Sequence, residues 1–225
     1  MNSSVCIVSG GMDSATALAL TIAGGRTPIA LHFSYRQRTE RRERRSFDAL
    51  CDFYAIKSRY TFDLGFFADI GASALTDLSI DVPQYADRAA AQGIPVTYVP
   101  FRNGIFLSIA AAVAEKESAD EIVIGAVEED SSGYPDCRER FLREMQTAIG
   151  LGVRDTTKIA INAPLIHLSK EQIVREALRL NVPLRLTWSC YQDGEKACGV
   201  CESCRLRLKG FTLANAVDPI AYFSN

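Results

Sequence analysis

The sequence lacks an excess of charge of either sign and lacks any long apolar run. Its 225 residues include 25 lysines and arginines and 27 aspartates and glutamates, which gives a formal net charge of −2. Proteins that bind nucleic acids usually carry a strong basic excess, so we expect no direct nucleic-acid partner. No apolar stretch approaches the length of a membrane span, and the N-terminus lacks the features of a signal peptide. We therefore expect a cytoplasmic protein with no membrane partner.

The chain also lacks two glycine-rich nucleotide motifs. Neither G-x-x-x-x-G-K-[ST], whose lysine reaches the β- and γ-phosphates, nor G-x-G-x-x-G occurs. The segment S-G-G-M-D-S at 9–14 stands instead after the apolar run 5–8, an order that predicts strand, tight turn and helix. Gly10 and Gly11 can adopt positive φ. Asp13 and Ser14 are good N-cap residues for the next helix.

Free backbone amides and the dipole at such a helix start form an anion site, which predicts phosphate binding at this loop. The alternative is an ordinary strand–turn–helix connection with incidental glycines. The residues expected to contact the nucleotide are Val8, Ser9, Gly10, Gly11, Met12, Asp13, Ser14 and Ala15.

The rest of the chain alternates apolar runs with helical patterns. Strands are expected at 5–9, 28–33, 58–64 and 122–125, with an extended segment at 159–164. Helices are expected from about 15 to 23, 39 to 54, 103 to 117, 139 to 150 and 170 to 180. This alternation predicts an α/β fold with a doubly wound, mostly parallel sheet. We expect an α/β domain at 1–185 with a smaller segment, 186–225, packed on it.

Four of the seven cysteines crowd together near the C-terminus, at Cys190, Cys198, Cys201 and Cys204. Their spacing, C-x7-C-x2-C-x2-C, offers the four thiolates of a closed, structural Zn²⁺ site. An iron–sulfur cluster also takes four cysteines, but the spacing is not that of a ferredoxin. A catalytic cysteine pair that passes sulfur to a substrate is a second alternative. Disulfides are not expected in a cytosolic chain.

Two further segments carry residues suited to substrate binding. In the polar loop 125–138, Tyr134 can stack on a heterocycle. The acidic residues of this loop can hold Mg²⁺ or a base edge, or form a solvated turn; they are Glu128, Glu129, Asp130 and Asp136. Arg102 and Asn103 precede an apolar, alanine-rich helix, and arginine suits bidentate recognition of a carboxylate or phosphate.

The charged run 36–45 is interpreted mainly as a solvated helix face. Only Arg36 and Arg38, directly after a strand end, are candidates for contact with a phosphate or a substrate carboxylate. His32 lies within a predicted strand and is expected to be a packed core residue. No residue is identified as the general base.

Several motifs together resemble one family over nearly the whole chain. They are SGGMDS at 9–14, SGYPDCR at 132–138, APLIHLSK at 163–170 and TWSCYQDGEKACGVCESCRLRLKGF at 187–211. These segments are similar to the 7-cyano-7-deazaguanine synthase (QueC) family of the N-type ATP pyrophosphatases, also called the PP-loop superfamily. The resemblance implies an adenine nucleotide alpha hydrolase-like fold with a C-terminal four-cysteine zinc knuckle.

The same resemblance implies an AMP-forming ligase. ATP adenylates the carboxylate of 7-carboxy-7-deazaguanine, ammonia gives an amide, and a second ATP activates that amide for dehydration to the nitrile. It also implies structural Zn²⁺, ATP with Mg²⁺, a role in queuosine biosynthesis and a homodimer. Lys170, at a helix start, corresponds to a lysine that approaches the nucleotide phosphates. We expect Asp13 and Lys170 to be catalytic.

The chain departs from the family pattern at Arg36, Thr39 and Gly104, where a glycine, often a histidine and an apolar residue are usual. These departures concern the acceptor more than the ATP site. An adenylating relative that stops at the amide, or that couples the acid to another amine such as one on a protein, is therefore an alternative. Modification of tRNA, by thiolation or lysidine formation, fits the charge balance less well. A zinc-stabilised interaction module leaves SGGMDS unexplained.

Overall fold

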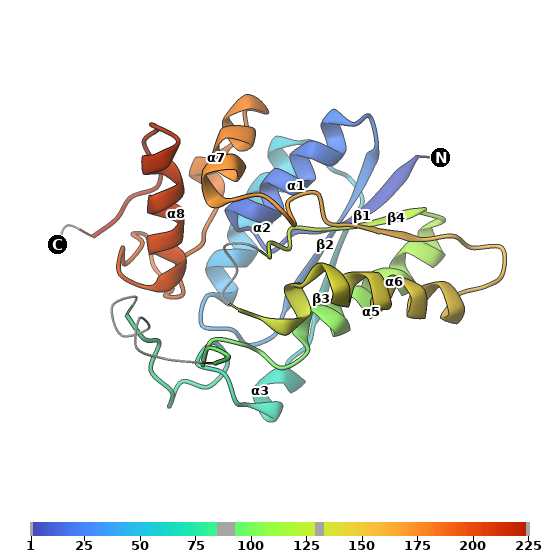
Figure 1. Cartoon of the computed structure of the whole chain (residues 1–225), viewed down its shortest axis with the longest axis horizontal. Helices are drawn as coiled ribbons and strands as arrows, with labels where there is room; N and C mark the ends of the chain where they lie inside the picture. The colour runs from blue at the N-terminus through green and yellow to red at the C-terminus, as the bar shows by residue number, and fades with distance from the viewer. Residues whose placement is uncertain (1, 85–92, 129–132, 224–225) are drawn as a thin grey trace.

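Five parallel strands form the sheet of the described chain, in the order β3–β2–β1–β4–β5 (Figure 1). The computed structural model describes residues 2–84, 93–128 and 133–223. The strands are β1 Ser3–Ile7, β2 Thr27–Ser34, β3 Arg59–Asp63, β4 Glu121–Ile124 and β5 Ala160–Asn162. Every residue of β1 is buried, as expected for a central strand covered on both faces. The predicted α/β fold with a parallel sheet is confirmed.

Helices cover both faces of this sheet. They are α1 Met12–Ala23, α2 Glu40–Phe53, α3 Phe66–Ile70, α5 Arg102–Glu117, α6 Glu139–Gly152, α7 Lys170–Arg179 and α8 Glu202–Leu213, with single 3₁₀ turns η1 Pro135–Cys137 and η2 Leu184–Leu186. Among the described residues, none of these helices combines the length and the apolar character needed to cross a bilayer.

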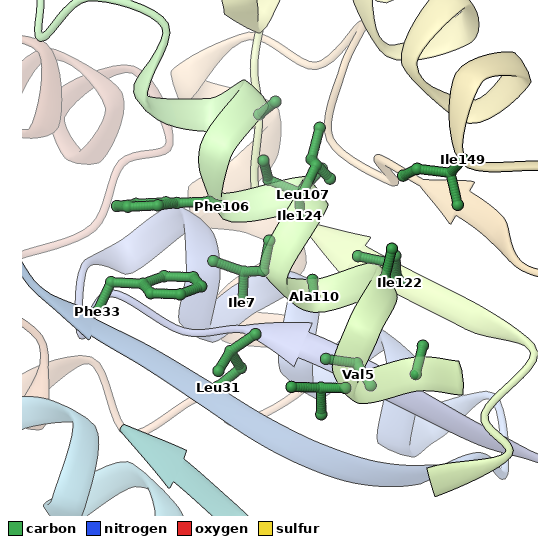
Figure 2. Close-up of a cluster of buried hydrophobic side chains, with 14 of the residues drawn as sticks. Val5, Ile7, Leu31, Phe33, Phe106, Leu107, Ala110, Ile122, Ile124 and Ile149 are labelled. Carbon is green, nitrogen blue, oxygen red and sulfur yellow. The ribbon is translucent and has the colours of Figure 1, made fainter. Parts of the chain in front are cut away.

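The strand residues alternate between two hydrophobic cores. Val5, Ile7 and Leu31 belong to the core on the face covered by α5 and α6, in the same cluster as Leu107 and Ile149 (Figure 2). Cys6, Val8 and Ala30 belong to the other core, with residues of α1, α2 and α7. The period of two in a strand sends adjacent residues to opposite faces, and each fully buried aliphatic side chain contributes about 1.5–3 kcal/mol. The sheet therefore connects the two helical layers, one packed on each of its faces.

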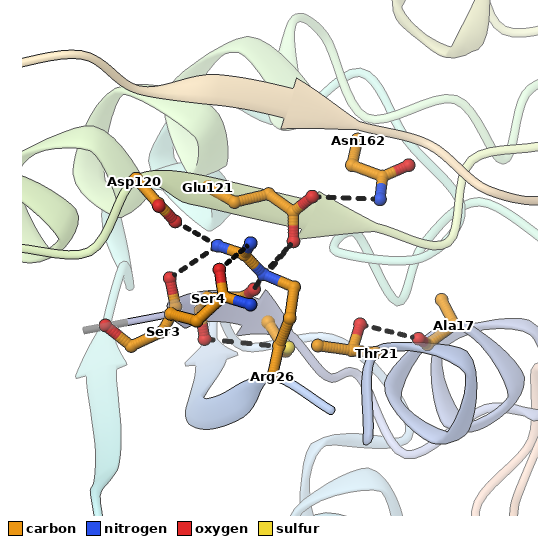
Figure 3. A network of polar contacts seen from close by, with 10 residues as sticks. Ser3, Ser4, Ala17, Thr21, Arg26, Asp120, Glu121 and Asn162 are labelled. Carbon is orange, nitrogen blue, oxygen red and sulfur yellow. Dashed lines mark hydrogen bonds and ion pairs between the residues drawn. The ribbon is translucent and has the colours of Figure 1, made fainter. Parts of the chain in front are cut away.

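A polar network closes the amino-terminal edge of the sheet. The guanidinium of Arg26 donates to the Ser4 hydroxyl and to Asp120, and it pairs with Glu121 at 3.0 Å (Figure 3). Asn162 of β5 donates to the same Glu121 at 3.1 Å. These bonds join β1 and β4 at their amino-terminal ends, and Asn162 connects the last residue of β5 to the first residue of β4.

The C-terminal segment shares a core with the α/β layers. Phe211 and Ala214 of α8 and the following turn pack in the same cluster as Ile173 and Val174 of α7. Gly210 makes this packing close, because a Cβ there would lie 2.9 Å from the carbonyl oxygen of Lys170. The division of the chain at residue 185 stays a prediction.

Most predicted elements are found within a few residues of their expected bounds. One local prediction is wrong: α1 begins at Met12 with Gly11 at the N-cap, so Asp13 and Ser14 lie in the first turn and are not caps. Glycine is among the residues that are preferred at an N-cap. Helix α7 begins with a capping box formed by Ser169 and Gln172. Helices α3 and α8 were not predicted.

Candidate active site

The S-G-G-M-D-S loop connects the carboxyl end of β1 to α1 through a turn that only glycine fits. Gly10 has φ of +93°, and a Cβ on it would lie 2.7 Å from the Glu43 carbonyl oxygen and 2.8 Å from the Ser46 Cβ. Both the backbone conformation and the space therefore exclude other side chains. The Trp188 amide donates to the Gly10 carbonyl at 2.9 Å and fixes the loop from the C-terminal segment.

The start of α1 has no side-chain cap among the described residues. Gly11 caps α1 without a side-chain hydrogen bond. The hydroxyls of Ser9 and Ser14 lie 3.1 Å apart, and Ser14 donates to the Gly11 carbonyl. On the other side, a Cβ on Gly125 would lie 2.9 Å from the backbone of Ser14. The end of β4 thus approaches the start of α1 closely, at the point where β1 separates β2 from β4. Such a switch point is where α/β sheets bind ligands.

Asp13 and Lys170 form an ion pair beside this loop. Lys170 Nζ lies 2.5 Å from Asp13 Oδ2, and the two side chains are 12% and 29% exposed. Lys170 begins α7 and Asp13 lies in the first turn of α1, so the pair joins two helix starts. Asp13 Oδ1 is buried and accepts no hydrogen bond from the described residues. This arrangement puts a cation and an unsatisfied carboxylate oxygen at the predicted phosphate site.

A cavity of about 300 Å³ opens from the loop. Apolar walls and a few polar groups line it, as in most small-molecule sites. From the first half of the chain its lining includes Val8, Ser9, Gly11, Met12, Asp13, Ser14, Tyr35, Gln37, Thr39 and Glu43. From the second half it includes Arg102, Asn103, Phe106, Tyr134, Cys137, Lys170, Trp188, Cys190 and Arg207. The structure thus brings together the loop, Lys170 and most of the predicted substrate residues.

Arg102 extends its guanidinium between aromatic rings of this cavity. Its Nη1 donates to the Tyr35 hydroxyl at 3.0 Å, and its Cζ lies 5.7 Å and 5.8 Å from the ring centroids of Tyr35 and Phe106. Burial raises the pKa of Tyr35 to about 12, so its hydroxyl stays neutral. Arg102 Nε is buried and has no hydrogen-bond partner among the described residues. This cation is suited to an anionic group of a ligand.

The other predicted substrate residues form one connected group around the start of α5. The Asp136 carboxylate accepts from the Asn103 amide at 2.8 Å, which satisfies a free N–H of the helix. Burial raises the pKa of Asp136. The Tyr134 hydroxyl donates to Thr97 or accepts from it at 2.8 Å, so its ring stays fixed on the cavity wall. Asp136 supports the site, while Tyr134 and Asn103 line it.

Two arginines predicted as candidates for ligand contact lie outside the cavity. Arg36 is exposed, and its backbone amide donates to Glu40. Arg38 donates to the carbonyls of Ala74, Asp77 and Ile80 and so anchors the segment after α3. Neither arginine lines the cavity.

The acidic residues of the 125–138 loop divide in the same way. The Glu128 carboxylate accepts from the Glu139 amide and caps α6, whereas Glu129 and Asp130 lie outside the described residues. The roles predicted for all of these residues stay predictions.

Sequence reasoning missed the acidic side of the cavity. Glu43 lies in the charged run that was interpreted as a solvated helix face, yet its side chain lines the cavity. Its carboxylate accepts from Thr39 at 2.5 Å and from Gln37 at 3.0 Å. Burial raises the pKa of Glu43, and these two hydrogen bonds oppose the increase. The only sequence signal was its position one turn into a helix that starts beside a strand end.

The C-terminal cysteines converge as their spacing predicted. The sulfur atoms of Cys190, Cys198, Cys201 and Cys204 all lie within 4.8 Å of one another, and all four residues are buried. Tetrahedral Zn–S bonds of about 2.3 Å separate the sulfurs by about 3.8 Å, so the cluster has the size of a zinc site. The Cys198 amide donates to Cys190 Sγ and the Cys201 amide to Cys198 Sγ, bonds that favour thiolates. The donor set fits Zn²⁺.

A buried arginine joins this cluster to the cavity. Arg207 of α8 pairs through two nitrogens with Asp218, at 2.7 and 2.9 Å. Its remaining N–H groups reach Thr187, Ser189 and the Leu184 carbonyl. This fork holds the segment that carries Trp188 against the loop, and Cys190 itself is part of the cavity wall. The four-cysteine cluster therefore adjoins the cavity and contributes Cys190 to its wall.

The prediction that His32 packs in the core is confirmed. His32 is fully buried, lies 2.9 Å from the Val8 carbonyl through Nδ1 and stacks on Phe47. Trp188 is 2% exposed and packs with the cysteine cluster.

The sheet is parallel, and a glycine loop without a lysine lies at its switch point. A later helix supplies the lysine, and a cavity lies beside the loop. Together these features define a PP-loop nucleotide enzyme. The family model described as "Queuosine biosynthesis protein QueC" matches residues 3–215, so the chain belongs to the QueC family. The resemblance inferred from the motifs is confirmed.

Curated relatives match the chain from end to end. It is 60% identical over 218 residues to the 7-cyano-7-deazaguanine synthase of Sulfurimonas denitrificans, which covers 97% of this chain and 96% of that one. It is 57% identical to the enzyme of that name from Aliarcobacter butzleri, over 97% and 94% of the two chains. For the Campylobacter fetus subsp. fetus protein the identity is 53%, over 100% and 99%.

Solved structures share the fold at low identity. A 4-thiouridine synthetase in complex with RNA and ATP has a TM-score of 0.50 at 17% identity, covering 98% of this chain and 47% of that one. A predicted tRNA methyltransferase subunit from Methanocaldococcus jannaschii has a TM-score of 0.51 at 12% identity, over 79% and 75%. These similarities support the fold alone.

Proposed function

We propose that the protein is an AMP-forming ligase that converts 7-carboxy-7-deazaguanine and ammonia to 7-cyano-7-deazaguanine, in queuosine biosynthesis. Relatives of that name match nearly the full length. The single structural observation that carries the proposal is one cavity that contains the pyrophosphate loop, the Asp13–Lys170 pair and a partly unpaired Arg102 guanidinium. A nucleotide and an anionic second substrate have matching groups in it.

The loop end of the cavity suits the departing pyrophosphate. Backbone amides at the start of α1 and the dipole of that helix stabilise negative charge. Lys170 adds a full positive charge at the same place. Charge builds on the β- and γ-phosphates as the α–β bond breaks, so a cation fixed here stabilises the transition state more than the ground state.

Arg102 suits the carboxylate that becomes adenylated. A guanidinium with an unpaired Nε, enclosed by the rings of Tyr35 and Phe106, gains strongly from an anionic partner because water screens it little. It would hold the substrate carboxylate with one oxygen free to attack the α-phosphorus. Tyr134 and Asn103 complete this wall.

The chemistry depends on the poor reactivity of a carboxylate. Its oxygen attacks the α-phosphorus of ATP, pyrophosphate leaves, and the acyl-adenylate now has AMP as a good leaving group. Ammonia attacks the acyl carbon, AMP and a proton leave, and an amide results. A second ATP adenylates the amide oxygen; loss of AMP and the two amide protons then gives the nitrile.

Two metal ions belong to the proposal. Asp13 Oδ1, buried and without a hydrogen-bond partner among the described residues, fits a ligand of the Mg²⁺ that accompanies ATP. Zn²⁺ fits the four buried cysteine sulfurs and would have a structural role, since all four positions are filled by the protein. Mg²⁺ would supply charge neutralisation at the phosphates.

We also infer a cytoplasmic homodimer that binds no nucleic acid directly, from the balanced charge and the family resemblance. Light scattering after size exclusion tests the dimer: a mass near twice 24.7 kDa is expected. A monomer at assay concentration contradicts it.

The activity is tested by incubating the zinc-loaded protein with ATP, Mg²⁺, ammonium and 7-carboxy-7-deazaguanine. Mass spectrometry is expected to detect the nitrile and AMP. If the amide is the final product, the protein is an amide ligase and not a nitrile synthase. ADP as the nucleotide product would contradict adenylation altogether.

A further inference from the structure

Glu43 presents a fixed carboxylate to the cavity on the side formed by the start of α2. One oxygen accepts from the Thr39 hydroxyl at 2.5 Å and the other from Gln37 Nε2 at 3.0 Å. Gln37 is itself fixed, because its Oε1 accepts from the Tyr35 amide at 2.8 Å. A carboxylate oxygen accepts two hydrogen bonds, so each oxygen of Glu43 keeps one acceptor position. The group thus keeps two acceptor positions, one on each oxygen of the carboxylate.

A carboxylate with one acceptor position on each oxygen matches a ligand edge with two adjacent N–H donors. The pyrimidinone ring of a guanine-type base has such an edge, formed by N1–H and the 2-amino group. The corresponding edge of adenine offers one donor and one lone pair, and the lone pair is repelled by a carboxylate. In nucleic-acid recognition, acidic side chains likewise pair with amino groups of bases. The chemistry of Glu43 therefore favours the deazaguanine over the adenine of ATP.

Charge along the cavity agrees with the polarity of this substrate. Tyr35 contacts both sides: its hydroxyl accepts from Arg102, and its amide donates to the Gln37 that fixes Glu43. In 7-carboxy-7-deazaguanine, the carboxylate is on the five-membered ring and the N1/2-amino edge is on the six-membered ring. One end of the substrate thus needs a cation and the other needs an acceptor.

We propose that Glu43, held by Thr39 and Gln37, binds the N1–H and 2-amino edge of the deazaguanine and determines specificity for it. The inference rests on the proposed function and adds a binding residue to it. It also gives Thr39 a role: this residue orients Glu43 and does not contact the carboxylate of the substrate.

The test is the kinetics of Glu43→Gln, which keeps the shape and replaces one acceptor with a donor. For the deazaguanine acid, kcat/KM is expected to fall about ten- to a hundredfold, the value of hydrogen bonds to a charged group. For ATP it is expected to change less than about threefold. Asp48→Asn is the matched control on the same helix, since Asp48 pairs with Arg44 on the surface, and it should leave both values unchanged. A larger loss for ATP than for the acid would overturn the proposal.

A substrate analogue without the 2-amino group provides a second measurement, which does not depend on how well the variant folds. The wild-type protein should turn the analogue over about ten- to a hundredfold less efficiently than the natural acid, while Glu43→Gln should discriminate much less between the two. If the decreases in kcat/KM caused by the variant and by the analogue simply multiply, the two changes act independently and the proposal is overturned. Failure of the wild-type protein to turn over the acid at all would instead contradict the proposed function.

Discussion

Lys170 Nζ lies 2.5 Å from Asp13 Oδ2, so the two helices that meet at the glycine loop are joined by one ion pair. The residues are 157 positions apart in the sequence. Without nucleotide, each charge neutralises the other. In the proposed reaction, the lysine would turn to the phosphates of the nucleotide and the carboxylate would bind the accompanying Mg²⁺. Each member of the pair would then exchange its present partner for one supplied by the substrate.

Removal of either charge is expected to abolish most of the activity while the fold remains intact. Asp13→Ala and Lys170→Met should each reduce kcat about a hundredfold or more, as for other groups that stabilise transition-state charge. Melting temperatures should stay within a few degrees, because a partly exposed ion pair contributes little to stability. Steady-state kinetics and calorimetry measure both.

Lys158→Met is the charge-matched control, since Lys158 is exposed on the opposite edge of the sheet. It should keep wild-type kinetics. An active Lys170→Met variant would contradict the role assigned to the lysine.

Gly210 is expected to be needed for the position of Lys170. A Cβ at Gly210 would lie 2.9 Å from the carbonyl oxygen of Lys170 and 3.0 Å from the Cβ of Lys170. Backbone atoms would have to move to relieve this overlap, which costs stability. Gly210→Ala should cost about 1–3 kcal/mol of stability and reduce kcat as α7 shifts. Gly150→Ala is the control on α6, where a Cβ meets nothing within 4 Å; it should stabilise the protein by about 0.4–1 kcal/mol. Equal effects of the two substitutions would contradict the close packing.

Loss of one cysteine of the cluster should remove the metal and destabilise the C-terminal segment together. Cys201→Ala leaves three thiolates and opens a site whose binding energy is coupled to local folding. We expect less than one zinc per chain by metal analysis, lower solubility and loss of activity, because Cys190 lines the cavity.

Cys51→Ala is the control for cysteine loss in general. Cys51 is fully buried in the core on the α1 and α2 side and is not part of the cluster. It should lower the melting temperature but keep one zinc per chain. A Cys201→Ala protein that is active without zinc would show that the metal is dispensable.

Burial of His32 is expected to make stability depend on pH. Burial lowers the pKa of His32 below its usual 6.5, while the hydrogen bond to the Val8 carbonyl opposes the decrease. Between the lowered pKa and 6.5, the unfolded chain binds a proton that the folded chain does not. The stabilising effect of the neutral ring is therefore complete above about pH 6.5 and is lost as the pH falls toward the folded pKa.

Urea unfolding at pH 7.5 and at lower pH values measures this dependence. His32→Gln should be less stable at pH 7.5 and should show a smaller decrease on acidification. The control His167→Gln concerns an exposed histidine that lies 3.6 Å from Glu139. It should keep the wild-type pH dependence; an unchanged dependence in His32→Gln would contradict the assignment.

Features that depend on a few adjacent residues are predicted well from the sequence. The strand β1 and the glycine turn that follows it are of this kind, and both are present. Glu43 could not be predicted in this way. Its neighbours are charged, and only the close approach of α2 to Gly10, with Thr39 and Gln37 beside it, turns the side chain into the cavity.

Arg207 is a second residue whose environment could not be predicted from the sequence. An arginine inside R-L-R-L-K is indistinguishable from a surface residue by pattern, and its burial depends on Asp218 and on the carbonyl of Leu184. Gly104 is a third case: a Cβ there would lie 2.4 Å from the Phe101 ring, which covers the start of α5. Contacts of this kind exist only once the helices are packed.

Arg36 departs from the family pattern, and a substitution can test whether this departure affects the backbone conformation or the function. Its φ is +57°, a left-handed conformation that costs a non-glycine residue about 1–2 kcal/mol. Its side chain lies over Gly65, where Nε is 2.9 Å from the position of a Cβ, and it does not line the cavity. Arg36→Gly should therefore raise the melting temperature by about 2–4 °C, the shift expected for 1 kcal/mol at this chain length. It should leave kcat/KM for the deazaguanine acid unchanged, whereas a tenfold loss would mean that the guanidinium reaches the substrate.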